Sequence, residues 1–258
     1  MAATAKKIVL ITGANTGIGW ETVKALLQSS QPYRVFLGSR SLERGEEAIS
    51  SLKKKVPETS SSVETIQVDV ESDDSINQAY EKIKAGPGYI DVLVNNAGAA
   101  MDPKIAKGEM TLREAYNKTY DINVSGTQVL THTILPLLLK SADPRLIFIT
   151  SGLSSLENMS NPSGPKPRVP SPDGYRASKV ALNLVMLSWH ARLREDGVKV
   201  WCVSPGFLAT GLGGDKELLV KSGAGHPSIG GKLITSVVEG ERDADVGKVV
   251  AGQGVQPF

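Results

Sequence analysis

Tyr175 and Lys179 are a pair of side chains whose types and spacing could move a proton. They lie in the segment Tyr-Arg-Ala-Ser-Lys, which opens a predicted helix over residues 173–195. Residues four apart on a helix share one face, so the phenol and the ammonium would approach one another. A nearby cation lowers the pKa of a phenol from about 10 and makes the hydroxyl a better general acid or base. The same spacing also arises by chance, so the surrounding sequence has to support this interpretation.

A glycine-rich turn lies between the first predicted strand and the first predicted helix. Residues 7–12 are mostly β-branched and apolar, which is typical of a strand buried on both faces, and Gly13, Gly17 and Gly19 follow. Such a turn points backbone N–H groups at a phosphate. The spacing G-x-x-x-G-x-G differs from the G-x-G-x-x-G dinucleotide fingerprint, and the Gly-Lys-Ser/Thr of a P-loop is missing. The alternative is a turn without a ligand, but its place between strand and helix favours a phosphate site.

The end of the second predicted strand indicates which dinucleotide would bind. Residues 34–38 form this strand, and Ser39 and Arg40 follow it. A carboxylate here would hold the free 2′-hydroxyl of NAD, whereas a hydroxyl and a guanidinium suit a 2′-phosphate. Arg44, one turn further on, could add positive charge. We therefore expect NADP(H) as the cofactor; the alternative is that Arg40 only solvates a loop.

Strands and helices alternate along the remaining chain. Further strands are predicted over 63–68, 90–94, 145–150, 198–203 and, weakly, 247–255, and helices over 42–55, 73–85, 112–140 and 229–239. This alternation predicts an α/β fold: a doubly wound parallel sheet with helices on both faces and ligands beyond the carboxyl ends of the strands. Asp69, Val70, Asn95 and Ser151 lie at such ends. The Pro-rich loop 152–172 can be neither regular helix nor central strand, and we expect it to overhang the site.

Composition favours one domain over 1–258, with a substrate-side tail over 211–258. The chain has 258 residues, a formal net charge of +2 and one cysteine, Cys202. This charge favours neither nucleic acid nor an acidic surface as a partner, and a single cysteine cannot form an internal disulfide. No segment approaches the roughly 18 apolar residues that span a bilayer, and residues 1–7 lack a secretory signal. We expect a cytoplasmic protein without a membrane partner or a metal site, because no metal-ligand spacing occurs.

The chain resembles the short-chain dehydrogenase/reductase family, and above all its carbonyl-reductase-type members. The resemblance extends from about Lys7 to Thr210, and its specificity comes from the order and spacing of several modest motifs. These motifs are TGANTGIG at 12–19, NNAG at 95–98, Asn123, Ser151, YRASK at 175–179 and Pro-Gly at 205–206.

The resemblance implies a Rossmann-like fold of about seven strands and a tetrad of Asn123, Ser151, Tyr175 and Lys179. Tyr175 would transfer the proton and Ser151 would hold the substrate carbonyl. Lys179 would lower the pKa of Tyr175 and bond the nicotinamide ribose, and Asn123 would hold a water in a proton relay. Besides Tyr175 and Lys179, the implied cofactor-binding residues are Gly13, Asn15, Thr16, Ile18, Gly19, Ser39, Arg40, Asp69 and Val70 (adenine), Asn95 (adenosine), Ala97, Pro205, and Leu208 and Thr210 (carboxamide).

Three functions follow from these residues. The leading prediction is an NADPH-dependent reductase that transfers hydride to a ketone or aldehyde, with Tyr175 as general acid. The same site could oxidise an alcohol with NAD(P)+ in a biosynthetic pathway. A third alternative is a non-catalytic NADP(H)-binding protein, although such a protein would be expected to have lost Tyr175 or Lys179.

The resemblance leaves substrate and assembly open. The interval from Ser151 to Tyr175 is longer than in many family members, and the stretch after Thr210 is rich in glycine. Substrate size therefore cannot be carried over to this chain. The family implies a homodimer or homotetramer that pairs the helices of Asn123 and Tyr175. An apolar set on the latter helix would face the partner subunit or the core: Leu182, Val185, Met186 and Trp189.

Overall fold

Seven parallel strands and one antiparallel strand form the sheet in a computed structural model that describes residues 6–163 and 171–258. The strands are β1 (Lys7–Ile11), β2 (Tyr33–Ser39), β3 (Ser62–Gln67), β4 (Val92–Asn95), β5 (Arg145–Ile149), β6 (Lys199–Ser204), β7 (Val249–Ala251) and β8 (Gly254–Gln256). Their order across the sheet is β3-β2-β1-β4-β5-β6-β7-β8. The predicted doubly wound parallel sheet is confirmed. The weak strand expected near 247–255 is two strands, because a two-residue turn pairs Ala251 with Gly254 in a hairpin.

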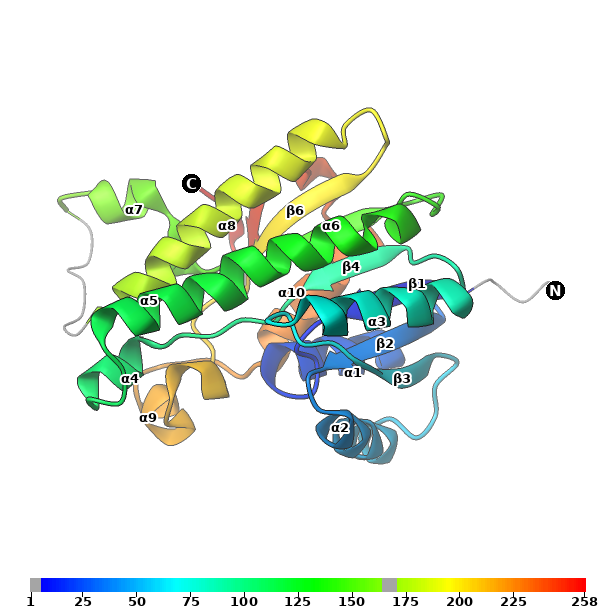
Figure 1. Ribbon diagram of the computed structural model, residues 1–258, viewed down its shortest axis with the longest axis horizontal. Helices are drawn as coiled ribbons and strands as arrows, with labels where there is room; N and C mark the ends of the chain where they lie inside the picture. Colours follow the sequence, from blue (N-terminus) through cyan, green and yellow to red (C-terminus); the bar gives the residue numbers. More distant parts are fainter. Residues whose placement is uncertain (1–5, 164–170) are drawn as a thin grey trace.

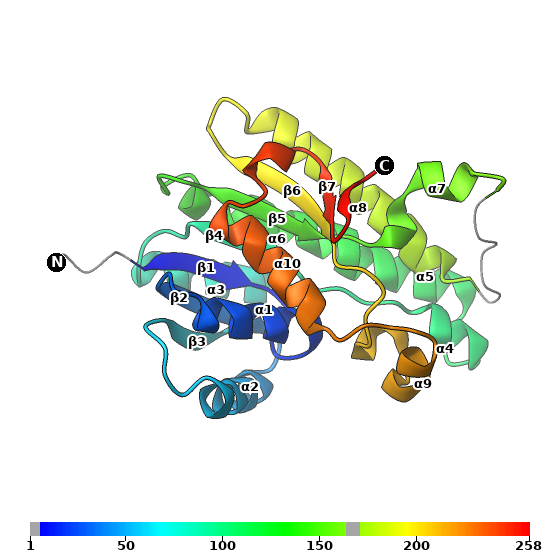
Figure 2. The same cartoon turned by 180° about the vertical axis from the view of Figure 1, so that it is seen from behind.

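Alternating residues of each buried strand fill two apolar layers. Ile8 and Leu10 of β1 face one layer, and Val9 and Ile11 face the other. The first layer is covered by α3 (Asp73–Ala85), α6 (Thr127–Leu138) and α8 (Asp173–Arg192), which lie before the sheet in Figure 1. The second is covered by α1 (Gly17–Gln28), α2 (Leu42–Lys55) and α10 (Ser228–Glu239), which face the viewer in Figure 2. Helices therefore cover both faces of the sheet.

The helix expected over 112–140 is interrupted. It consists of α5 (Leu112–Tyr120), a π-helical segment η1 (Asp121–Gly126) and α6. A π turn holds one residue more than an α turn, and such turns are frequent at functional sites. Gly126 ends the segment against the carbonyl of Val70, with which an added Cβ would overlap. Close packing between the end of β3 and this helix therefore requires glycine.

Three short helices were not expected from the sequence: α4 (Asp102–Ala106), α7 (Leu156–Ser160) and α9 (Lys216–Lys221). The expectation of no regular helix in the Pro-rich loop was wrong for α7, since the prolines of that loop begin only at Pro162. The expected overhang of the loop concerns residues 164–170 above all, which lie outside the described residues. The 3-10 turns are η2 (Gly152–Ser154), η3 (Gly211–Gly213) and η4 (Asp243–Asp245).

The C-terminal part of the chain packs against two regions of the fold. Residues 209–227 lie beside the first turns of α1, whereas α10 packs along α1 and β7 and β8 extend the sheet. Within the described ranges, no helix has the length and apolar character needed to cross a membrane.

Candidate active site

Tyr175 and Ser151 meet beyond the carboxyl end of β5. Ser151 begins the turn η2, and its Oγ accepts the N–H of Leu153 at 3.2 Å. Tyr175 lies in the first turn of α8, half-buried, and the side chain of Ser151 approaches its phenol closely enough to act on its pKa. The structure thus brings together the phenol and the hydroxyl that the sequence placed 24 positions apart in two different elements.

Lys179 lies one turn further along α8, where only 4% of it is exposed. Its Nζ donates to the carbonyl of Ile149 at 2.7 Å and lies 5.7 Å from the ring centre of Tyr175. Burial disfavours the charged form and lowers the pKa of Lys179 to about 8. The ammonium is therefore held next to the phenol by its hydrogen bond to the end of β5.

The pKa of Tyr175 moves opposite to the prediction. Burial raises it to about 12, and the neighbouring Ser151 side chain opposes this rise. The expectation that Lys179 lowers this pKa was wrong. The burial of the phenol raises its pKa by more than the neighbouring protein groups lower it. A phenol with such a pKa is fully protonated at neutral pH and is a weaker acid than a free tyrosine.

Asn123 joins the loop after β4 to helix α8. Its Oδ1 accepts the N–H of Ala99 at 2.8 Å, and its Nδ2 donates to the Ala99 carbonyl at 2.8 Å and to Ser178 Oγ at 2.9 Å. Ser178 Oγ in turn donates to the carbonyl of Tyr175 at 2.7 Å. The amide is fully buried and has protein partners on both atoms. The side-chain amide of Asn123 therefore serves to join these elements, and the relay water expected from the resemblance stays a prediction.

The glycine turn has the geometry of a phosphate cradle. Gly13 and Gly17 have φ of 60° and 61°, and a Cβ at Gly13 would lie 2.9 Å from Ala97 Cα. Thr16, the N-cap of α1, makes no side-chain cap bond. The first N–H groups of α1 thus keep their capacity to bind an anion. The half-buried Asn15 and Ile18 flank the same turn.

Asn96, which was not among the predicted site residues, braces this turn. Its Nδ2 donates to the carbonyls of Thr12 at 2.8 Å and Gly13 at 3.1 Å. A Cβ at Gly19 would lie only 2.5 Å from that Nδ2. Asn95 points elsewhere: it is buried and donates to Thr131 Oγ1 of α6 at 2.9 Å. The two adjacent amides of the NNAG motif were the sequence signal for this role. Successive residues of a strand point to opposite sides, and this alternation separates the role of Asn96 from that of Asn95.

Ser39 and Arg40 differ in what they offer a ligand. The hydroxyl of Ser39 is buried and donates to the carbonyl of Ser41 at 2.8 Å. Arg40 is exposed, and its guanidinium has no ion pair within the described chain. Arg44 is exposed on α2. Of the pair predicted to face a 2′-phosphate, only Arg40 presents an uncommitted group.

Asp69 and Val70 follow β3 on the same edge of the sheet. The half-buried Asp69 accepts the N–H of Glu71 with Oδ1 at 3.1 Å. Val70 is buried, with its carbonyl against Gly126. The end of β3 is thereby held in one position beside the π-helical segment.

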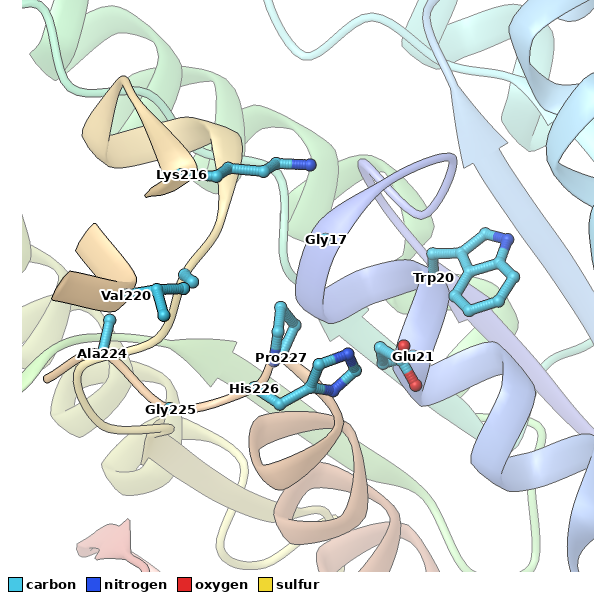
Figure 3. Close-up of a pocket in the computed structure, with 10 residues that line it drawn as sticks. Gly17, Trp20, Glu21, Lys216, Val220, Ala224, Gly225, His226 and Pro227 are labelled. Atoms are coloured by element: carbon cyan, nitrogen blue, oxygen red, sulfur yellow. The ribbon is translucent and has the colours of Figure 1, made fainter. Parts of the chain in front are cut away.

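The segment after β6 approaches the glycine turn. Pro205 and Leu208 are buried, and Thr210 is half-buried, with its Cβ 3.8 Å from where a Cβ of Gly17 would stand. A pocket of about 550 Å³ opens between the first turns of α1 and residues 209–227. Figure 3 shows Trp20 and Glu21 on one side of it and Lys216 extending from α9 toward Gly17.

Comparison with known proteins agrees with this arrangement. A family model described as short chain dehydrogenase matches residues 7–218. Over 100% of its length the chain is 53% identical to short-chain dehydrogenase/reductase tropE of Talaromyces stipitatus and 44% identical to eupG of a Phoma species, covering 100% and 99% of those proteins. The solved structure of NADPH-bound carbonyl reductase from chicken fatty liver is 26% identical, with a TM-score of 0.78 over 98% of this chain and 99% of that one. Family match, identity and fold agree, and the chain belongs to the short-chain dehydrogenase/reductase family.

Proposed function

We propose that the protein is an NADPH-dependent reductase that transfers hydride to a ketone or aldehyde, with Tyr175 as general acid. Membership of an oxidoreductase family supports the reaction class. The observation that carries the proposal is the approach of the Ser151 side chain to the phenol of Tyr175, beside the buried Lys179. NADPH supplies the hydride when bound, and the protein contributes placement and the proton.

The residues around the glycine turn fit a dinucleotide. A Cβ at Gly13 or Gly19 would overlap atoms in or beside this turn, and the first turn of α1 lacks a side-chain cap. In the proposal the phosphates contact Gly13, Asn15, Thr16, Ile18 and Gly19. Arg40 pairs with the 2′-phosphate. Ser39 contributes through the conformation of its backbone, because its hydroxyl is already hydrogen-bonded to Ser41. Adenosine lies along Asp69, Val70, Asn95 and Ala97, and the nicotinamide end along Pro205, Leu208, Thr210, Tyr175 and Lys179.

The protonation states at neutral pH are those that carbonyl reduction needs. Tyr175 is protonated, as a general acid must be, although its pKa of about 12 makes the phenol a weaker acid than a free tyrosine. Ser151 orients the carbonyl oxygen toward that proton. Lys179, with a pKa lowered to about 8, is charged at neutral pH and stabilises the phenolate that remains. Alcohol oxidation would use the same groups in reverse, with Tyr175 as general base, so the assays with NADPH and NADP+ decide the direction.

The test is a panel of ketones and aldehydes with loss of NADPH absorbance as the readout. The variant Tyr175→Phe keeps the ring and its packing but removes the proton donor. We expect it to lower kcat by about 100-fold or more, the contribution typical of general acid catalysis, with NADPH affinity retained. Unchanged turnover would end the proposal. Faster alcohol oxidation with NADP+ would favour the dehydrogenase, and tight NADPH binding without turnover would favour the non-catalytic protein.

Cofactor choice has its own experiment. Replacing Arg40 with alanine removes a guanidinium that has no partner in the described chain. We expect the NADPH preference over NADH to fall by about 10-fold or more, since a charge-assisted contact to a phosphate contributes about 1.5–3 kcal/mol. A preference that does not change would show that Arg40 only solvates the loop.

We also propose a homodimer or homotetramer formed through α5, α6 and α8. Leu182, Met186 and Trp189 are buried in the core and so cannot form its interface, whereas Leu184 on α8 is 66% exposed. Sedimentation equilibrium tests this proposal, and Leu184→Glu is expected to shift the assembly toward the monomer. A monomeric wild type would contradict it.

A further inference from the structure

Helix α8 begins without a cap of its own. Its N-cap is Pro172, whose side chain has no acceptor, and no cap bond comes from that residue. The first backbone bond of the helix joins Arg176 N–H to the carbonyl of Pro172 at 2.9 Å. The N–H groups of Gly174 and Tyr175 precede that bond and need other partners. The residue with the phenol therefore lies where a helix frays most easily.

Asp102 supplies the missing cap from 72 residues away. Its Oδ1 accepts the N–H of Gly174 at 2.8 Å, and its Oδ2 accepts the N–H of Tyr175 at 3.1 Å. These two amides are the ones that an N-cap side chain normally binds, and a carboxylate also complements the positive end of the helix dipole. A Cβ at Gly174 would lie 3.2 Å from Oδ1 and 3.1 Å from the ring of Tyr116, so glycine allows this approach.

The segment that carries Asp102 is itself anchored. Ala99 exchanges two hydrogen bonds with Asn123, and Met101 N–H donates to Thr119 Oγ1 at 3.3 Å. Both partners are fully buried on the helix beside α8. Asp102 is thus fixed relative to α5 and η1 by bonds that do not involve the backbone of α8. Figure 1 shows the starts of α4, α5 and α8 at the same end of the molecule.

We propose that Asp102 is a positioning residue for Tyr175, in addition to the tetrad. The bond from Oδ2 holds the backbone of Tyr175 itself, so it holds the phenol beside Ser151. Lys179 lies a full turn deeper and has its own bond to Ile149. Loss of the cap therefore displaces the proton donor more than the residue expected at the nicotinamide ribose. The kinetic part of this inference rests on the proposed function.

The experiment compares Asp102→Ala with Asp102→Asn, which keeps the shape and one acceptor. We expect kcat to fall about 10- to 100-fold in the alanine variant, since small misplacements of reacting groups cost this much. The asparagine variant recovers part of this loss. NADPH affinity stays within about twofold, and the solvent deuterium isotope effect on kcat rises because proton transfer becomes slower. If the alanine variant does not fold, the asparagine variant carries the same test.

Thr111→Ala is the matched control, because it removes the capping box of α5 and leaves the α8 cap intact. We expect it to cost similar stability without a change in kcat or in the isotope effect. Equal kinetics for Asp102→Ala and Thr111→Ala would overturn the proposal. A second readout, independent of turnover, is the ζ-carbon resonance of Tyr175, assigned with Tyr175→Phe. It should move in Asp102→Ala even if the wild type reduces no carbonyl; an unmoved resonance would refute the positioning role.

Discussion

Replacing Lys179 with methionine should stabilise the protein at neutral pH while it removes activity. Burial lowers the pKa of Lys179 from 10.5 to about 8. One pKa unit corresponds to about 1.4 kcal/mol, so keeping this ammonium charged in the folded state costs about 3 kcal/mol. The unfolded chain binds more protons between pH 8 and 10.5. Wild-type stability therefore rises with pH through this window, and the cost is fully present only below about pH 8.

Methionine keeps the length of the side chain and removes the charge, but it also removes the donor to Ile149. An unsatisfied buried carbonyl costs about 1–3 kcal/mol, which offsets part of the gain. We expect Lys179→Met to be more stable than the wild type by up to about 2 kcal/mol at pH 7. At pH 10.5 the lysine is largely neutral and keeps its hydrogen bond, so the order should reverse.

Urea unfolding of both proteins at several pH values from about 7 to 10.5 measures this difference. Lys140→Met is the control, since Lys140 donates to the carbonyl of Gly88 at 3.1 Å but is exposed. It should change stability by less than about 1 kcal/mol without a reversal. A stability difference between Lys179→Met and the wild type that does not vary with pH would refute the reasoning.

Two further variants test contacts outside the candidate site that support the fold around it. Asp243→Asn removes a carboxylate whose pKa is held below its usual range by Arg145 and Lys199. Such a carboxylate stabilises above its unfolded pKa and loses that effect as pH falls, so the variant should lose about 1.5–3 kcal/mol at pH 7 and less near pH 3. Gly126→Ala would overlap the carbonyl of Val70 and should cost about 1–3 kcal/mol and weaken NADPH binding.

Chemical unfolding and NADPH titration measure these two effects. Gly252→Ala is a control for the second, because a Cβ there meets no atom within 4 Å. Equal stability losses at pH 7 and pH 3 would contradict the role of Asp243. Unaltered stability of Gly126→Ala would show that the end of β3 yields to the added methyl group.

Much of the fold follows from local sequence pattern. Central strands buried on both faces read as continuous apolar runs, and glycine turns and polar residues mark where they end. The bounds of α2 and α3 were predicted as observed, because caps and charges at their ends are local signals. The interruption at η1 was missed, and the packing of its last residue, Gly126, against Val70 involves a residue remote in the chain. Helices α4, α7 and α9 are too short to show a period.

By itself the sequence determined which chemical groups are present and at which edge of the sheet they gather. Only the tertiary structure decided the pKa values and the hydrogen-bond partners of these groups. Burial set the pKa of Tyr175 and Lys179, a local hydrogen bond withdrew the hydroxyl of Ser39, and Asp102 reached the helix of Tyr175 from 72 residues away. These outcomes depend on desolvation and on distances between residues remote in the chain, which spacing along a sequence does not encode.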